Sequence, residues 1–205
     1  MIFTYSTIKA KSHHCGKAIR ALKDTPPNAI ERQSGTHYGT WIPQLGLTSR
    51  DFIVMYSWPD DKANLAVPIT ETFLLSLDDV AEVSTRRWAP TARPLDSKVP
   101  DREGLYIHRT MVFNVTDIPQ VVEMSQQAWE TFEAQFDAQV YGFFKDMDEK
   151  AGTTTLTLVS WYRDYTAWEE SRNAEKDPGS WEIFYKRGRL TLDSWGISTR
   201  LLLQG

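Results

Sequence analysis

One histidine and a group of tyrosines are the residues of this sequence best suited to acid–base chemistry. His108 lies within the run Leu105–Val115 and is the only imidazole there. An imidazole titrates near neutral pH, so on a cavity wall His108 could act as a general base, a general acid or a haem ligand. A buried histidine hydrogen-bonded to a neighbour would need no function. We take His108 as the first catalytic candidate.

Tyr38 and Tyr141 are the other catalytic candidates, because they lie 103 positions apart and each precedes a glycine. Their phenols could orient a carbonyl or phenol group of a substrate, although aromatic packing alone would also explain them. Further residues are expected on the same cavity wall and are predicted to contact substrate: Tyr5, Tyr106, Thr110, Trp58 and Trp161.

Arg109 is a charged residue among apolar neighbours. It shares one face of the run Leu105–Val115 with Ile107 and Met111, and an arginine on such a face needs an anionic partner. The partner is either a carboxylate of a covering helix or the acid group of a substrate. We favour the structural ion pair and keep Arg109 among the substrate-binding candidates.

Motifs of common cofactor and metal enzymes are absent from the sequence. It has no glycine-rich phosphate loop, no Gly-x-Ser-x-Gly elbow and no zinc-finger spacing. His13, His14 and Cys15 are adjacent, but neighbouring side chains point apart and no carboxylate joins them at a helical step, so we expect a surface helix start there. The sequence predicts no metal site and no tightly bound cofactor.

A strand, a helix and a hairpin are predicted to position these candidates. The run Leu105–Val115 is rich in β-branched and aromatic residues, which is typical of a strand. Alternation places Tyr106, His108 and Thr110 on one face and the more apolar set on the other, which should lie under helices. A helix is expected from Pro119 to Phe136, and strands over 139–145 and 154–162.

The same order of elements is predicted earlier in the chain at a constant offset. Besides the tyrosines, Ser57-Trp58 and Ser160-Trp161 lie 103 positions apart, which indicates a tandem duplication without insertion from Phe3/Tyr106 to Asp61/Asp164. We predict a first unit over residues 1–94, a linker over 95–103 and a second unit over 104–205. If so, Trp58 and Trp161 occupy equivalent places.

Composition limits the class of protein. The 205 residues are 41% hydrophobic and 24% charged, which is ordinary for a globular chain with a sizeable core. The net charge of −4 argues against nucleic acid as a partner. No apolar run is long enough for a membrane helix, and the N-terminus does not resemble a signal peptide, so a cytoplasmic location and no membrane partner are expected.

The second half resembles the dimeric α/β-barrel superfamily, and within it the NIPSNAP-like branch. The resemblance rests on the strand Tyr106-Ile-His-Arg-Thr-Met, the helix segment Ala128-Trp-x-x-Phe132 and the strand end Val159-Ser-Trp-Tyr-Arg-Asp164 before Ala167-Trp168. The first half departs from this pattern, since Ser6 stands where the arginine would be. The resemblance implies an α+β fold in which two ferredoxin-like units lay antiparallel sheets around a cavity, and it is compatible with a homodimer.

Three functions remain open on the sequence. The first is a cofactor-independent lyase, cyclase, isomerase or monooxygenase that acts on an aromatic or polyketide-like compound by acid–base chemistry at His108. The second is a non-catalytic NIPSNAP-like protein that binds a small molecule or a partner. The third is a haem protein with His108 as axial ligand. A small-molecule ligand is common to the first two.

Overall fold

The first half of the chain contains four strands, two short helices after the first strand and a longer helix before the last one. The computed structural model describes residues 1–26, 28–148 and 152–203. The elements of this half are β1 (Ile2–Ala10), α1 (Gly16–Asp24), α2 (Asn28–Glu31), β2 (Thr36–Leu45), β3 (Asp51–Trp58), the short 3-10 helix η1 (Asp60–Lys62), α3 (Ala63–Leu75) and β4 (Val80–Pro90).

The second half repeats this order with a longer first helix and a divided second one. Its elements are β5 (Leu105–Asn114), the short 3-10 helix η2 (Val115–Asp117), α4 (Ile118–Gln135), β6 (Ala138–Asp146), β7 (Thr153–Tyr162), α5 (Tyr165–Glu170), α6 (Pro178–Gly188) and β8 (Asp193–Leu201). None of the helices among the described residues has the length and apolar content needed to cross a bilayer.

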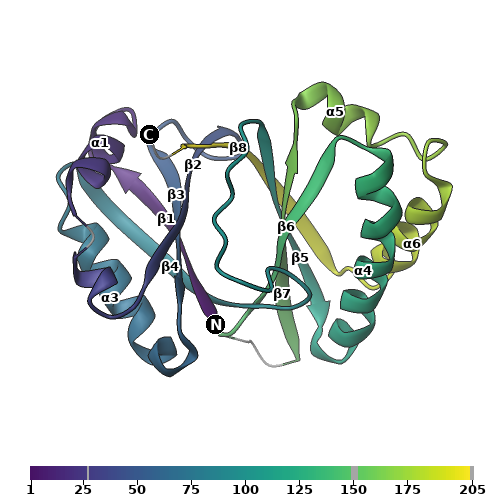
Figure 1. Cartoon of the computed structure of the whole chain (residues 1–205), viewed down its shortest axis with the longest axis horizontal. Coiled ribbons are helices and arrows are strands. Elements are labelled where there is room, and N and C mark those ends of the chain that lie inside the picture. Colours follow the sequence, from purple (N-terminus) through teal and green to yellow (C-terminus); the bar gives the residue numbers. More distant parts are fainter. Residues whose placement is uncertain (27, 149–151, 204–205) are drawn as a thin grey trace.

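All eight strands close into one antiparallel barrel, in the order β1-β3-β2-β8-β5-β7-β6-β4. Each half supplies four neighbouring strands, and the two seams are formed by β2 with β8 and by β4 with β6. The helices lie on the two outer sides of the molecule and the strands between them (Figure 1). This confirms the predicted α+β fold with two ferredoxin-like units in a dimeric α/β-barrel arrangement.

Side-chain alternation along β5 separates the barrel interior from the helix-covered face. Tyr106 belongs to an aromatic cluster inside the barrel. Met111 and Phe113 belong to a second cluster with Trp129 of α4. The predicted orientation of this strand is confirmed, because a period of two leaves no other arrangement once one face is covered by helices.

The predicted gapless register is wrong for β3 and β7. Ile2 pairs with Trp58, whereas Leu105, 103 positions after Ile2, pairs with Tyr162, which is 104 positions after Trp58. A shift by one residue in a strand moves each side chain to the other face. Trp58 therefore lies in the helix-covered cluster of the first half, while Trp161 lies inside the barrel.

The segment between β4 and β5 crosses one end of the barrel, at the middle of the view in Figure 1. Its backbone accepts hydrogen bonds from two aromatic side chains of the interior. Tyr106 Oη donates to the carbonyl of Arg102 at 2.9 Å, and Trp161 Nε1 donates to the carbonyl of Glu103 at 2.8 Å. These contacts tie the segment to the aromatic residues at this end of the barrel.

Candidate functional site

The barrel interior brings together most of the residues selected from the sequence. Its cluster includes Tyr5, Tyr38, Tyr106 and Trp161, and the buried His108 contacts Tyr5. Thr110 lies on the same face of β5 as His108, whereas Arg109 faces the outer side and Trp58 is outside the barrel. Thr110 Oγ1 is 3.0 Å from Thr157 Oγ1, and Trp58 Nε1 donates to Thr4 Oγ1 at 3.1 Å beneath α3.

His108 is enclosed by aromatic side chains. Its side chain is 2% exposed, its Nδ1 lies 3.4 Å from Tyr5 Oη, and its ring centroid is 5.2 Å from that of Trp41. Burial lowers the pKa of His108 to about 3, because the cation would lose its hydration. A general base works best with a pKa near the operating pH, so this imidazole is neutral but weakly basic at neutral pH.

Three buried polar atoms of the interior have no hydrogen-bond partner among the described residues. They are His108 Nε2, Tyr38 Oη and Trp41 Nε1. Burial is also the main cause that raises the pKa of Tyr38 and Tyr106 above the ordinary phenol value. Both phenols are therefore proton-bearing donors at neutral pH rather than bases.

Tyr141 differs from Tyr38 although both face the interior from equivalent strands. Its Oη donates to Asp101 Oδ1 at 3.5 Å, in the segment that crosses the barrel end. Its ring lies 5.6 Å from that of Tyr106, and burial raises its pKa. The structure thus places Tyr141 at one end of the barrel, near that connecting segment, and Tyr38 among the packed rings.

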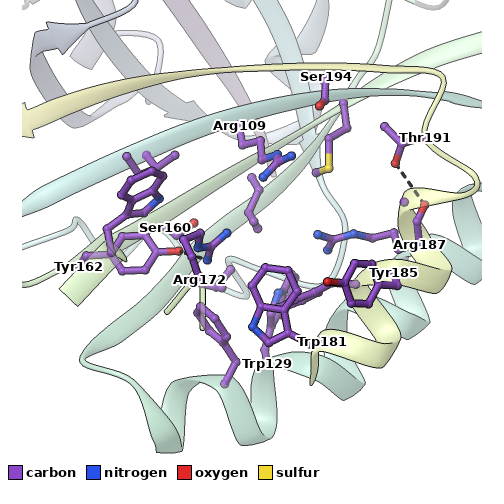
Figure 2. A pocket seen from close by; sticks show the side chains of 18 of the residues that line it. Arg109, Trp129, Ser160, Tyr162, Arg172, Trp181, Tyr185, Arg187, Thr191 and Ser194 are labelled. Atoms are coloured by element: carbon purple, nitrogen blue, oxygen red, sulfur yellow. Dashed lines mark hydrogen bonds between the residues drawn. The ribbon is translucent and has the colours of Figure 1, made fainter. Parts of the chain in front are cut away.

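A cavity of about 390 Å³ lies outside the barrel, between the covered face of the second sheet and helices α4 to α6. Three arginines line it: Arg109 from β5, Arg172 from the loop after α5, and Arg187 from α6. Figure 2 shows their guanidinium groups extending into the same space. We call this cavity the arginine pocket.

Local structure fixes the arginine that comes from α6. Asp177 caps this helix by accepting a hydrogen bond from Ser180 N, and Ser180 Oγ donates to the carbonyl of Ala128 in α4 at 2.8 Å. Docked in this way, α6 turns Arg187 inward, where its Nη1 donates to Ser125 Oγ at 3.0 Å. The side chain of Arg187 is held between two helices and the sheet.

The three guanidinium groups have no acidic partner among the residues that the structure describes. Within the part of the chain that the structure describes, no carboxylate forms an ion pair with Arg109, Arg172 or Arg187. The helix carboxylate expected for Arg109 is therefore not its partner. Arg172 Nη2 donates to Tyr162 Oη at 3.5 Å. Asp193 lines the same cavity, but it is exposed.

Burial and mutual repulsion lower the pKa of two of these groups, which remain charged at neutral pH. The pKa of Arg187 falls to about 10, chiefly through burial and then through Arg109 and Arg172. The pKa of Arg172 is lowered by burial first and by Arg109 among the further causes. Like charges in a low-dielectric site disfavour each other. The pocket is thus positively charged before any ligand is present.

Aromatic rings form the other walls of the pocket. Arg172 lies 5.5 Å above the ring of Trp181 and Arg187 lies 5.0 Å above the ring of Phe184. Trp129 and Tyr185 also line the cavity. The indole Nε1 of Trp181 is buried and has no partner among the described residues. The pocket therefore offers charge-assisted donors and flat apolar surfaces.

Arg172 and Arg187 were missed by the sequence reasoning, which selected only Arg109. A signal for Arg187 was present, because it follows Trp181 and Phe184 at helical steps and so lies on the apolar stripe of α6. No comparable signal marks Arg172, which lies between two helices. Its place depends on the packing of α5 and α6 on the sheet.

The residues present do not fit a haem at His108. The imidazole is 2% exposed and its neighbouring rings lie within 6 Å, so no space for a macrocycle remains beside it. The described residues that line the arginine pocket include no histidine or cysteine. No group of three or more His, Cys, Asp or Glu side chains among the described residues could hold a metal ion.

Comparison with known proteins shows similarity of structure. No protein-family model and no curated sequence matches the chain. A candidate monooxygenase from Lactobacillus acidophilus NCFM has a TM-score of 0.63 at 12% identity, over 100% of this chain and 96% of that one. An anthrone oxidase-like protein has a TM-score of 0.58 at 7% identity, over 98% of this chain and 91% of that one. A mutant chlorite dismutase from Candidatus Nitrospira defluvii has a TM-score of 0.56 at 6% identity, over 98% of this chain and 92% of that one. At these identities the shared property is the fold.

Proposed function

We propose that this protein binds a small organic anion with an aromatic or apolar body in the arginine pocket. The observation that carries the proposal is the set of three guanidinium groups around one cavity without a carboxylate partner. Arg187 is the most informative of them, because it is only 9% exposed. Buried charges in proteins are normally paired, so the missing negative charge is best supplied by a ligand.

An anion would relieve a cost that the free protein carries. The pKa of Arg187 is lowered from the ordinary arginine value to about 10, which corresponds to a destabilisation of the cation on the order of 3 kcal/mol. A carboxylate between the three arginines would offset the repulsion and could accept a bidentate hydrogen bond from a guanidinium. Part of that relief is then available as binding free energy.

The lining of the pocket supports a flat ligand body. Trp129, Trp181 and Phe184 present aromatic surface to the cavity, and a volume of about 390 Å³ is in the range of small-molecule sites. The names of the structural neighbours, a monooxygenase candidate and an anthrone oxidase-like protein, support an aromatic or polyketide-like compound as the ligand class.

If the protein is an enzyme, its chemistry should take place on the anion in this pocket. We propose a cofactor-independent lyase, isomerase or monooxygenase reaction there as the extension of the binding function. His108 and Tyr38 are separated from the arginine pocket by the sheet, since they face the barrel interior. The acid–base mechanism at His108, Tyr38 and Tyr141 receives less support from the geometry than ligand binding at Arg109.

The similar order of elements in the two halves supports a second proposal, on origin. We propose that the chain arose by duplication of one ferredoxin-like unit, with one residue gained between the later hairpin strands. Membership of a NIPSNAP-like branch and association into a homodimer also stay proposals. Size-exclusion chromatography with light scattering tests the dimer, and a monomer mass at micromolar concentration would refute it.

Calorimetric titration with naphthoate and with the isosteric neutral naphthamide tests the anion proposal. Naphthoate should bind at least about ten-fold more tightly than the amide, since each charge-assisted hydrogen bond contributes ~1.5 to 3 kcal/mol. Arg187→Met and Arg109→Met should remove this preference. Arg163→Met is the matched control, because Arg163 is exposed and ion-paired with Asp137 outside the pocket at 2.9 Å.

Two results would refute the anion proposal. One is equal affinity of the native protein for naphthoate and naphthamide. The other is an equal loss of naphthoate binding in the Arg163→Met control and in Arg187→Met, which would show a nonspecific effect of net charge. Far-ultraviolet circular dichroism of each variant separates loss of binding from loss of fold.

A further inference from the structure

A second cavity, of about 340 Å³, lies beside the arginine pocket along the outer face of β8. Leu45 at the end of β2, Tyr165 and Trp168 of α5, and Gly196 of β8 contribute to its walls. We call this cavity the β8 groove. It lies where the helices of the second half leave the strand exposed.

The β8 groove adjoins the arginine pocket. Both cavities are lined by Ile107, Arg109, Trp168 and Ser194. Arg109 therefore stands between them, with the more buried Arg187 on one side and the open groove on the other. A ligand long enough to pass the Arg109 side chain could contact both cavities.

Small residues on β8 keep the groove open. Gly196 pairs with Arg109 across the strands, so the two positions face the same side of the sheet. A Cβ built on Gly196 would meet only the backbone oxygen of His108, at 3.7 Å, which is an ordinary contact. Ser194 and Ser198 occupy the same face at steps of two. A larger side chain at position 196 would project into the groove without strain.

The walls of the groove are unusually apolar for an exposed surface. Ten large hydrophobic side chains are exposed among the described residues, and four of these line the groove: Leu45, Tyr165, Trp168 and Trp195. Such a concentration marks a binding surface rather than scattered exposure. Trp168 also lines the arginine pocket, so the apolar surface begins at the charged site.

We propose that the ligand is an elongated amphipathic anion, with its acid group between Arg109, Arg172 and Arg187 and its apolar extension in the β8 groove. This inference rests on the proposed function of the arginine pocket and specifies the class of ligand it takes. The acid group occupies the buried, charged end. The extension passes Arg109 and lies between Trp168 and Leu45, where it covers exposed apolar surface.

Calorimetry with benzoate, para-butylbenzoate and para-octylbenzoate tests the groove separately from the pocket. Affinity should rise with the alkyl chain by up to ~4-fold per methylene, the factor for burying one such group, and level off when the groove is filled. Gly196→Leu should remove most of the gain from the octyl chain and leave naphthoate affinity unchanged. Ala81→Leu, at an exposed position of β4 in the other half, is the matched control and should change neither.

The outcomes separate the two proposals. If naphthoate binds but the alkyl chain adds nothing, or if Gly196→Leu and Ala81→Leu act alike on para-octylbenzoate, the elongated ligand is refuted and the anion site stands. If naphthoate fails to bind the native protein, the anion site itself is refuted. If Gly196→Leu changes the mass in solution and no ligand affinity, the groove is a contact between copies of the chain, which also overturns the proposal.

Discussion

Acidification should destabilise this protein in a way that depends on His108. Burial holds the pKa of His108 at about 3 in the folded protein, whereas an unfolded histidine titrates near 6.5. The folded pKa is depressed, so the unfolded chain binds the additional proton as the pH falls below about 6.5. The stabilisation from a neutral His108 is fully present above that pH and is lost progressively toward pH 3.

The size of the effect follows from the distance to the unfolded pKa. A pH of about 5 lies about 1.5 units below the pKa of the unfolded histidine, so His108 is protonated in the unfolded chain but still neutral in the folded protein. At ~1.4 kcal/mol per unit, the free energy of unfolding is then lower by about 2 kcal/mol. His37 should add a further loss in the same direction, because burial lowers its pKa to about 4. Both losses are large beside a typical total stability of ~5 to 15 kcal/mol.

Urea denaturation of the native protein and of His108→Gln measures the contribution of His108 alone. The amide can form hydrogen bonds but cannot ionise, so the native protein should lose about 2 kcal/mol more than the variant between pH values of about 7 and 5. His37→Gln should show a similar difference. Parallel pH profiles for the native protein and His108→Gln would show that His108 titrates normally, and would refute the closed aromatic environment described for it.

Arg187→Met should raise the free energy of unfolding by about 1 kcal/mol in urea denaturation, because it removes a buried charge that has no carboxylate partner among the described residues. Any decrease in the free energy of unfolding would show that the guanidinium is satisfied in the free protein. Trp58→Phe should lower the free energy of unfolding by about 1 to 3 kcal/mol, since it removes the buried hydrogen bond to Thr4, and should leave the affinity for naphthoate unchanged in titration. Weaker naphthoate binding would place Trp58 in the site. Asp177→Ala should lower the free energy of unfolding by about 1 kcal/mol, because α6 loses its cap, and should weaken naphthoate binding because α6 carries Arg187. Asp177→Asn should keep both the stability and the affinity, and a decrease of either in the Asn variant would assign Asp177 another role.

The sequence predicts the fold well where one face of a strand is clearly apolar. The alternation of Ile107 and Met111 with Tyr106 and His108 defines both faces of β5, because the period of a strand is fixed at two. The sequence does not predict the difference in register between the pairing of β3 with β1 and the pairing of β7 with β5. The pairing of β7 with β5 differs by one residue from that of β3 with β1, so Trp58 and Trp161 lie on opposite faces of their strands although their sequence spacing matches that of the other paired positions.

The candidate site could be predicted only in part for a different reason. Arg109 was visible because a charge on an apolar strand face is conspicuous in the sequence. The other two arginines of the pocket, Arg172 and Arg187, follow Arg109 in the chain by 63 and 78 residues. Only the docking of α6 on α4, through Ser180 and Ala128, brings them to one cavity. Such proximity is a tertiary property that local patterns do not contain.

The two seams of the barrel, β2 with β8 and β4 with β6, join strands of the same polypeptide. Barrel formation is then a first-order reaction, whereas a barrel assembled from two chains depends on their concentration. Closure of the barrel within one chain should therefore not depend on protein concentration. The two halves also differ in their helix-covered layers. The first buries Trp58 against Thr4, while the second contains the arginine pocket.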